Sequence, residues 1–282
     1  MDVSLFDYWP APAKLNLMLR IVGRRVDGYH LLQTVFQFLD ISDMIGFRIR
    51  QDGRICRVNE LPGVTANDDL IVRAAKLLQQ YSGSALGVDI HLKKQLPMGA
   101  GLGGGSSDAA TTLKVLNKLW ESRCSTDQLA DLGLTLGADV PVFVRGRSSW
   151  GEGIGEILQP IELPPRWYLV LVPPCHVSTA EIFSDPELTR DSPRIRIADF
   201  LAGSVQNDCL SVVCRRYPPV QEAMRWLGHY SSPRLTGTGA AVFASFEDEV
   251  SARQVYKEVP GVYRAFVARG VNCSPVEDDL VS

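Results

Sequence analysis

The sequence predicts a two-domain α+β protein, and three observations indicate this fold class. Alternating apolar residues typical of strands and apolar residues at helical spacing follow one another through the first half of the chain. Prolines cluster between residues 159 and 174, as in a linker between domains. The second half again mixes strand and helix patterns, which favours a small α+β sandwich. We therefore expect one domain over 1–158 and a second over 159–282.

The first half contains a hairpin, a helix and a further strand in our interpretation. Residues 12–22 and 33–39 alternate as strands do, and the turn at 24–28 separates them. A helix is expected over 68–81, because Leu70, Ile71, Ala74, Leu77 and Leu78 recur at helical spacing. Val88, Ile90 and Leu92 then predict a strand.

The second half is predicted to begin with a strand over 167–172, which is bracketed by Pro160, Pro164, Pro165, Pro173 and Pro174. The patterns that follow predict these elements in order: a helix at 218–229, a turn at 236–239, a strand at 240–246, a helix at 248–258 and a strand at 263–270.

Composition and charge narrow the function classes. The chain has 282 residues, an ordinary apolar content and a net charge of −3 with interspersed signs, which argues against nucleic acid as a partner. No apolar stretch has the length of a membrane span and no signal peptide is recognisable, so we expect a cytoplasmic protein with no membrane partner. The six cysteines lack the spacing of a zinc site and are expected to be reduced thiols.

Residues 97–108 have the composition of a phosphate-binding loop. Five glycines fall within the seven positions 99–105, and glycine allows successive backbone amides to turn toward one anion. A helix follows, for which Ser106 or Ser107 can be the cap, Asp108 suits the first turn, and Leu113, Leu116, Leu119 and Trp120 supply the helical spacing. The N-terminus of that helix would add its dipole to the anion site.

Other glycine-rich loops must be compared with this one. Gly99, Gly101 and Gly104 also satisfy the dinucleotide-binding fingerprint, with Glu121 at a tolerable distance, so a dinucleotide-dependent oxidoreductase stays an alternative. A Walker loop would need a lysine before its hydroxyl residue, and a protein-kinase loop would need motifs that are not found downstream. A flexible glycine turn is the remaining structural alternative.

Two isolated charges stand in otherwise apolar segments and are candidates for catalysis. Lys14 and Asp139 could pair with one another or with a ligand, although a structural ion pair or surface exposure explains them equally well. Tyr29 and His30 follow a glycine turn and could read a ligand or simply face solvent or the core. The turn at 236–239 could likewise be an ordinary entry to a strand.

Five segments together resemble the GHMP kinase superfamily of small-molecule kinases. They occupy residues 12–17, 27–30, 97–107, 137–143 and 234–240, stand in the order of the family's motifs, and the resemblance extends from about residue 9 to 275. It implies a two-domain GHMP kinase fold, with an N-terminal mixed α/β nucleotide-binding domain and a C-terminal ferredoxin-like α+β sandwich. The active site is then expected in the cleft between them.

The resemblance also implies substrates and cofactors. Within the superfamily, the motifs are most similar to those of kinases that use ATP and Mg²⁺ to phosphorylate a hydroxyl of a cytidyl diphosphate substrate in non-mevalonate isoprenoid precursor biosynthesis. A homoserine-type or mevalonate-type kinase and a catalytically inactive binding protein on the same fold are the alternatives. We expect a monomer or weak homodimer.

Residue roles carry over by motif. The resemblance implies that Asp139 is the base, Lys14 is its partner, Asn16 orients the acceptor, and Tyr29 and Phe183 enclose a cytosine ring whose polar edge bonds to His30. The nucleotide is expected to contact Lys94, Pro97, Met98, Gly99, Ala100, Gly101, Leu102, Gly103, Gly104, Gly105, Ser106 and Ser107. Asp69 replaces an asparagine found in many relatives, and no metal-ligating residue is assigned.

Overall fold

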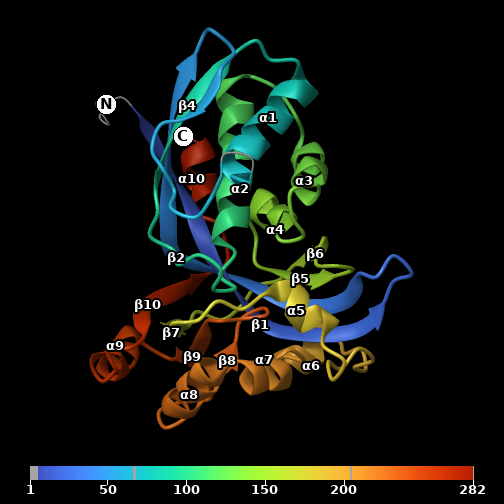
Figure 1. Cartoon of the computed structure of the whole chain (residues 1–282), viewed down its shortest axis with the longest axis vertical. Helices are drawn as coiled ribbons and strands as arrows, with labels where there is room; N and C mark the ends of the chain where they lie inside the picture. Colours follow the sequence, from blue (N-terminus) through green and yellow to red (C-terminus); the bar gives the residue numbers. More distant parts are fainter. Residues whose placement is uncertain (1–5, 66–67, 204, 282) are drawn as a thin grey trace.

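The computed structural model describes residues 6–65, 68–203 and 205–281, and it has two parts stacked along its long axis (Figure 1). The strands are β1 (Asp7–Arg24), β2 (His30–Arg50), β3 (Ile55–Arg57), β4 (Gly87–Lys93), β5 (Ser149–Glu152), β6 (Ile157–Pro160), β7 (Trp167–Val172), β8 (Arg234–Leu235), β9 (Val242–Phe246) and β10 (Arg264–Val271). The helices are α1 (Leu70–Ser82), α2 (Gly104–Leu119), α3 (Thr126–Leu134), α4 (Val140–Arg145), α5 (Thr179–Ser184), α6 (Ile197–Leu201), α7 (Leu210–Arg216), α8 (Pro218–Leu227), α9 (Glu249–Lys257) and α10 (Val276–Val281).

A long antiparallel hairpin joins the two parts. β1 and β2 pair from Asp7 with Phe47 to Arg24 with His30, and their register shifts at three places, so the hairpin bends as it passes from one part to the other (Figure 1). The main sheet path is β3-β4-β2-β10-β7-β9-β8. Only Gly270 and Val271 of β10 pair with β2, so the contact between the two halves of the sheet is narrow.

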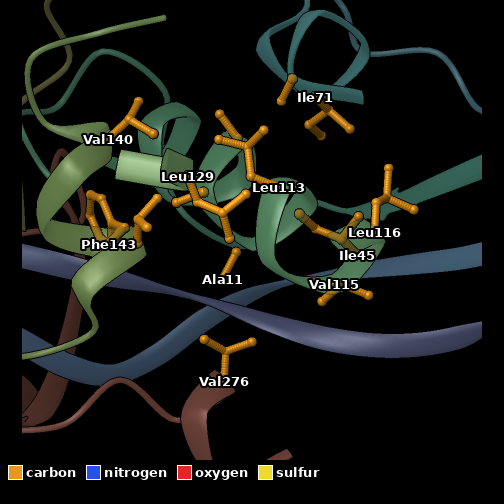
Figure 2. Packing of buried hydrophobic residues seen from close by; sticks show 14 of the residues in the cluster. Ala11, Ile45, Ile71, Leu113, Val115, Leu116, Leu129, Val140, Phe143 and Val276 are labelled. Carbon is orange, nitrogen blue, oxygen red and sulfur yellow. The ribbon is translucent and has the colours of Figure 1, made fainter. Parts of the chain in front are cut away.

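Helix α2 is the centre of the first core. Its side chains Leu113, Val115 and Leu116 are fully buried, and they pack with Ile71 of α1, Ile45 of β2 and Phe143 of α4 (Figure 2). Apolar burial of this kind contributes about 25 cal/mol for each Å² removed from water. The helix is thereby fixed against the sheet, and its N-terminus carries the glycine loop.

The second part places α7, α8 and α9 against the sheet of β7, β9 and β10 (Figure 1). Alternate residues of β7 serve two cores. Leu169 and Leu171 face the helices, whereas Tyr168 and Val170 face the cluster next to β1. The chain then returns to the first part, where Val276 of α10 joins the core around α2 (Figure 2).

The structure confirms the predicted hairpin, the helices α1, α2, α8 and α9, and the strands β4, β7, β9 and β10. The expected capping of α2 is wrong. The helix begins at Gly104, and Gly103 occupies the N-cap position with a left-handed φ of 73° and no side-chain cap. Ser106 and Ser107 therefore lie inside the first turn, and Asp108 lies beyond it. No helix in the described part of the chain is long and apolar enough to cross a membrane.

Candidate active site

Three adjoining cavities lie around the glycine loop and the β1–β2 hairpin. The inner cavity, of about 330 Å³, is lined by Leu61, Val64, 68–71, Lys94, 97–106 and Asp108. The central cavity, of about 290 Å³, is lined by Lys14, Asn16, Leu19, Leu32, Thr34, Phe36, Gly101, Ser106, Ala138, Asp139, Ile154, Thr179, Phe183, Gly237 and Thr238. The outer cavity, of about 510 Å³, is lined by Arg24, 27–30, Leu32, Ala138, Ile154, 179–180 and 183–184. Neighbouring cavities share wall residues, so together they form a continuous site.

The backbone of the glycine loop is oriented by both parts of the molecule. The carbonyl of Ala100 accepts from the amide of Ala241, that of Gly101 from the hydroxyl of Thr236, and that of Leu102 from the amide of Lys14. In contrast, none of the amides from 98 to 106 donates to an acceptor in the described residues. Because the carbonyls are held on the protein side, the free amides and the N-terminus of α2 are available to an anion.

The glycines of this loop are required at specific positions. Gly99, Gly101 and Gly103 all have left-handed φ values, of 66°, 75° and 73°. A Cβ on Gly101 would lie 2.5 Å from the carbonyl oxygen of Thr236, and one on Gly103 would lie 3.0 Å from Cε of Lys14. The loop therefore approaches both the second part and the candidate catalytic lysine as closely as a backbone can.

Of the predicted nucleotide residues, Lys94 and all of 97–106 line the inner cavity. Ser107 does not, since its side chain is fully buried and its hydroxyl has no partner in the described residues. Ser106 is better placed, because it lines both the inner and the central cavity.

Lys94 is held by two carboxylates at the wall of the inner cavity. Its Nζ lies 2.6 Å from Oδ2 of Asp43 and 2.7 Å from Oδ2 of Asp108. Burial raises the pKa of Asp108 to about 7, although the positive charge of Lys94 opposes this shift. Sequence analysis did not identify Asp43 or Asp108 as neighbours of Lys94.

Asp69 is also engaged within the protein. Its Oδ1 accepts from the amide of Ile71 at the start of α1, and its Oδ2 forms a short ion pair with the buried Arg57. The carboxylate thus caps a helix and neutralises an arginine at the edge of the inner cavity.

Lys14 and Asp139 meet in the central cavity. Nζ of Lys14 lies 3.1 Å from Oδ2 of Asp139, and the lysine side chain is 3% exposed whereas the aspartate is 36% exposed. Lys14 also donates to Oδ1 of Asn16, and Nδ2 of Asn16 donates to Thr34 at 2.9 Å. The side-chain amide of Asn16 thus orients Lys14, and Lys14 in turn holds Asp139, whose carboxylate lines the open cavity.

The turn at 236–239 closes the central cavity from the second part. The amide of Asn16 donates to Oγ1 of Thr236, and the hydroxyls of Thr179 and Thr238 lie 2.8 Å apart. The turn was noted in the sequence, but an entry to a strand explained it equally well. Leu19, Leu32, Thr34, Ile154 and Thr179 were missed, because no local pattern distinguishes them from ordinary helix, strand or loop residues.

The outer cavity brings together Tyr29, His30 and Phe183, the three residues that the resemblance assigns to the cytosine ring. Tyr29 is 59% exposed, whereas the rings of His30 and Phe183 stack on one another with centroids 4.9 Å apart and planes at 26°. Burial, followed by the charges of Arg190 and Arg24, lowers the pKa of His30 from its ordinary value. Nε of Arg190 lies 3.1 Å from Nε2 of His30.

The dinucleotide-binding alternative is wrong. Such a site needs a parallel strand after the helix that follows the loop. Here β4 leads through α2, α3 and α4 to β5, and these two strands are not neighbours, because β4 pairs with Met44–Arg50 of β2 whereas β5 pairs with Thr34–Phe36 of the same strand. Glu121 follows the far end of α2, sixteen residues of helix away from the loop.

Comparison with known proteins agrees with this geometry. The family model described as the GHMP kinases N terminal domain matches residues 69–147. The 4-diphosphocytidyl-2-C-methyl-D-erythritol kinase of Methylococcus capsulatus is 58% identical over 272 residues, covering 96% of this chain and 94% of the relative. The enzyme of the same name from Halorhodospira halophila is 55% identical over 271 residues, covering 95% of this chain and 94% of the relative.

Solved structures have the same fold. A crystal structure of 4-(cytidine 5'-diphospho)-2C-methyl-D-erythritol kinase matches with a TM-score of 0.80 and 33% identity, covering 94% of this chain and 99% of the other. A crystal structure of mevalonate kinase matches with a TM-score of 0.69 at 16% identity and the same coverage, which shows the shared fold alone.

The two-domain fold, with a glycine loop that leads into a helix and faces a lysine–aspartate pair, is that of the GHMP kinases. The identity over nearly the full length is more specific: the chain belongs to the 4-diphosphocytidyl-2-C-methyl-D-erythritol kinase family.

Proposed function

We propose that this chain transfers the γ-phosphoryl group of ATP to the 2-hydroxyl of 4-diphosphocytidyl-2-C-methyl-D-erythritol, giving the 2-phosphate and ADP in isoprenoid precursor biosynthesis. The observation that carries the proposal is the position of the Lys14–Asp139 pair. It lies in the central cavity, which shares walls with a phosphate-binding loop on one side and with an aromatic cavity on the other.

Asp139 is the group that takes the proton of the attacking hydroxyl. Its carboxylate is the more exposed member of the pair, and an acceptor placed in the central cavity comes within reach of it. Lys14 keeps the carboxylate in place and adds a positive charge beside the oxygen that becomes a nucleophile. Asn16 acts through Lys14, because its Oδ1 accepts from Nζ of the lysine.

The inner cavity holds the phosphates of ATP through backbone amides and the N-terminus of α2. Phosphoryl transfer depends chiefly on positioning and on stabilising the developing charge, which this preoriented loop supplies. Its carbonyls are fixed by bonds from both parts of the molecule, so the amides need little reorganisation when the nucleotide binds.

Ser106 would hold Mg²⁺ where the inner and central cavities adjoin. This ion is usually held by one or two protein oxygens together with phosphates and water, and Ser106, which carries a hydroxyl, lines both cavities. No cluster of three or more metal-ligating side chains occurs among the described residues, which is compatible with such a site. When bound, Mg²⁺ supplies charge neutralisation on the transferred group.

The outer cavity receives the cytidine end of the substrate. Tyr29 and Phe183 offer ring faces for stacking, and His30 offers a hydrogen-bonding ring nitrogen. Stacking accepts any base, so the hydrogen bond supplies the discrimination.

A coupled assay of ADP release tests the reaction. We expect turnover with the cytidyl substrate and none with homoserine or mevalonate, and phosphorus NMR should locate the new phosphate on the 2-hydroxyl. The assay is repeated after removal and return of Mg²⁺ to test the metal. Turnover of mevalonate or homoserine in preference to the cytidyl substrate would refute the proposed acceptor.

Two further expectations belong to this proposal. The cytoplasm is the location that supplies ATP, and six free thiols are compatible with its reducing conditions. We expect a monomer or a weak homodimer, which light scattering tests. We also expect each chain to consist of two domains, 1–158 and 159–282, and limited proteolysis tests this division.

A further inference from the structure

Arg190 contacts His30 and Phe183, which line the outer cavity, and the proposed reaction assigns it no role. It lies in the segment after α5, and its guanidinium makes bonds in three directions. Nη1 donates to the carbonyl of Leu188, Nη2 donates to the carbonyls of Phe183 and Asp185, and Nε lies 3.1 Å from Nε2 of His30. The arginine therefore touches both residues of the stacked His30–Phe183 pair.

The bond to His30 determines where the imidazole carries its proton. A guanidinium has only donors and does not lose its proton in proteins, so Nε2 of His30 must be the acceptor. A neutral imidazole with an acceptor at Nε2 carries its hydrogen on Nδ1. The lowered pKa of His30, caused by burial and by the charges of Arg190 and Arg24, agrees with a neutral ring.

Nδ1 is available to a ligand. His30 lines the outer cavity, and none of the described residues forms a hydrogen bond with its Nδ1. This nitrogen is also absent from the buried atoms that lack a partner, so it retains accessible surface on a residue that lines the open cavity. The cavity is therefore presented with a ring N–H donor and not with an acceptor.

We propose that Arg190 is a positioning residue that fixes His30 in its Nδ1–H form and so selects a base with a ring acceptor. Cytosine presents an unprotonated N3, whereas uracil presents an N3–H that would face the donor and leave both groups unpaired. The inference rests on the proposed function for the identity of the base. The position of the proton on His30 is independent of it.

Arg190 also holds its own segment, so a control for loosening is needed. Asp185 in the same segment is bound through its carboxylate by Arg215 and Arg216 of α7, with Nε of Arg216 at 2.5 Å. Arg216→Gln weakens this anchor without removing a contact to His30. The Arg216→Gln variant therefore shows the effect of loosening the segment after α5 while the bond from Arg190 to His30 is kept.

The first measurement needs no substrate. Long-range proton–nitrogen NMR of the ¹⁵N-histidine-labelled, ligand-free protein distinguishes the two neutral imidazole forms, and loss of a signal in His30→Gln assigns it. We expect the Nδ1–H form in the unmodified protein and in Arg216→Gln, and a rise of the Nε2–H form in Arg190→Met. The Nε2–H form in the unmodified protein would overturn the inference, whether or not any variant folds.

The second measurement is kcat/KM for the cytidyl substrate and its uridine analogue. In Arg190→Met the imidazole is free to present Nδ1 as an acceptor, so the preference for cytidine should fall by about tenfold or more. Arg216→Gln should lower kcat/KM for both substrates by the same factor and so leave the preference for cytidine unchanged. An unchanged preference in Arg190→Met would contradict the inference. Failure of the unmodified protein to turn over either analogue would instead refute the proposed function.

Discussion

The inner and outer cavities are built in different ways. The inner cavity is formed largely by one continuous segment, 97–106, whose backbone amides are its proposed binding groups. The outer cavity gathers side chains from the hairpin turn, from Ala138 and Ile154, and from α5. A site made of backbone is sensitive to a Cβ added where the chain is closely approached, whereas a site made of side chains is sensitive to their removal. The two cavities should therefore respond to opposite kinds of substitution, while the catalytic pair between them affects chemistry alone.

The largest effect is expected at the junction of the two cavities. Asp139→Asn removes the proton acceptor but keeps the shape, so kcat should fall by about 10² to 10⁴-fold with little change in ATP binding. Lys14→Ala should act in the same direction. Asp131→Asn on the exposed face of α3 is the control and should retain activity. Near-normal turnover by Asp139→Asn would mean that another group takes the proton.

The next effect distinguishes two glycines of the inner cavity. Gly101→Ala places a Cβ 2.5 Å from the carbonyl oxygen of Thr236 at a left-handed φ, which costs about 1 to 3 kcal/mol, and the Kd for ATP should rise about 10 to 100-fold. Gly105→Ala meets only Leu70 at 3.5 Å and should change the Kd about twofold or less. Isothermal titration calorimetry with ATP measures both. Equal effects would show that the loop's backbone geometry does not govern binding.

A side-chain deletion should affect the outer cavity alone. Tyr29→Ala removes an exposed ring, so folding should be unaffected, and kcat/KM should fall by about 5 to 50-fold for cytidyl and uridyl substrates alike. Tyr81→Ala removes a ring of similar exposure at the end of α1 and serves as the matched control. If Tyr29→Ala weakened ATP binding as much as substrate binding, the assignment of separate cavities would fail.

The smallest effect concerns the pH dependence of stability, which should differ in sign between the two cavities. The pKa of Asp108 is raised to about 7, so the folded protein binds a proton that the unfolded chain has lost, and stability falls as the pH rises from about 4 to 7. The lowered pKa of His30 has the opposite consequence, and it adds stability as the pH rises toward the ordinary value of histidine.

Urea unfolding at pH 5, 6 and 7 tests this difference. Asp108→Asn should remove a decline of the free energy of unfolding with pH, of at most about 1.4 kcal/mol per pH unit. His30→Gln removes the opposing contribution of His30 and keeps Asp108, so in this variant the decline should be steeper than in the unmodified protein. The exposed Asp127 on α3 gives a control, Asp127→Asn, that should leave the slope unchanged. If the free energy of unfolding still declined with pH in Asp108→Asn, groups other than Asp108 would be responsible for the decline.

The same contrast explains what the sequence could predict. The glycine loop is local, so its composition alone indicated a phosphate site, and the resemblance needed only contiguous motifs to identify Lys14 and Asp139. The predicted start of α2 was wrong, because either Ser106 or Ser107 could cap a helix. In the structure the N-cap position is occupied by Gly103, which has a left-handed φ. Backbone conformation of this kind is set by the close packing of Gly103 against Phe143 and Lys14, which no local pattern reveals.

The outer cavity was less predictable, since its supporting contacts join distant parts of the chain. Arg190 and His30 are 160 residues apart. The inner cavity has one contact of the same kind, since Lys94 reaches Asp43 over 51 residues. Neither pair has a sequence spacing that a helix or strand would impose. Burial of charge was equally hidden: the sequence placed Asp108 in the first turn of the helix, whereas in the structure its side chain is buried and burial raises its pKa.

The β1–β2 hairpin has one more consequence, because Lys14 is on β1 and His30 begins β2. Strand geometry fixes the separation of these residues, so the hairpin sets the distance between the proposed point of phosphoryl transfer and the proposed point of base recognition. On this proposal, a substrate with a longer or shorter bridge between hydroxyl and base would not reach both ends at once. Substrate length, and not only substrate chemistry, would then depend on the number of residues from Lys14 to the hairpin turn.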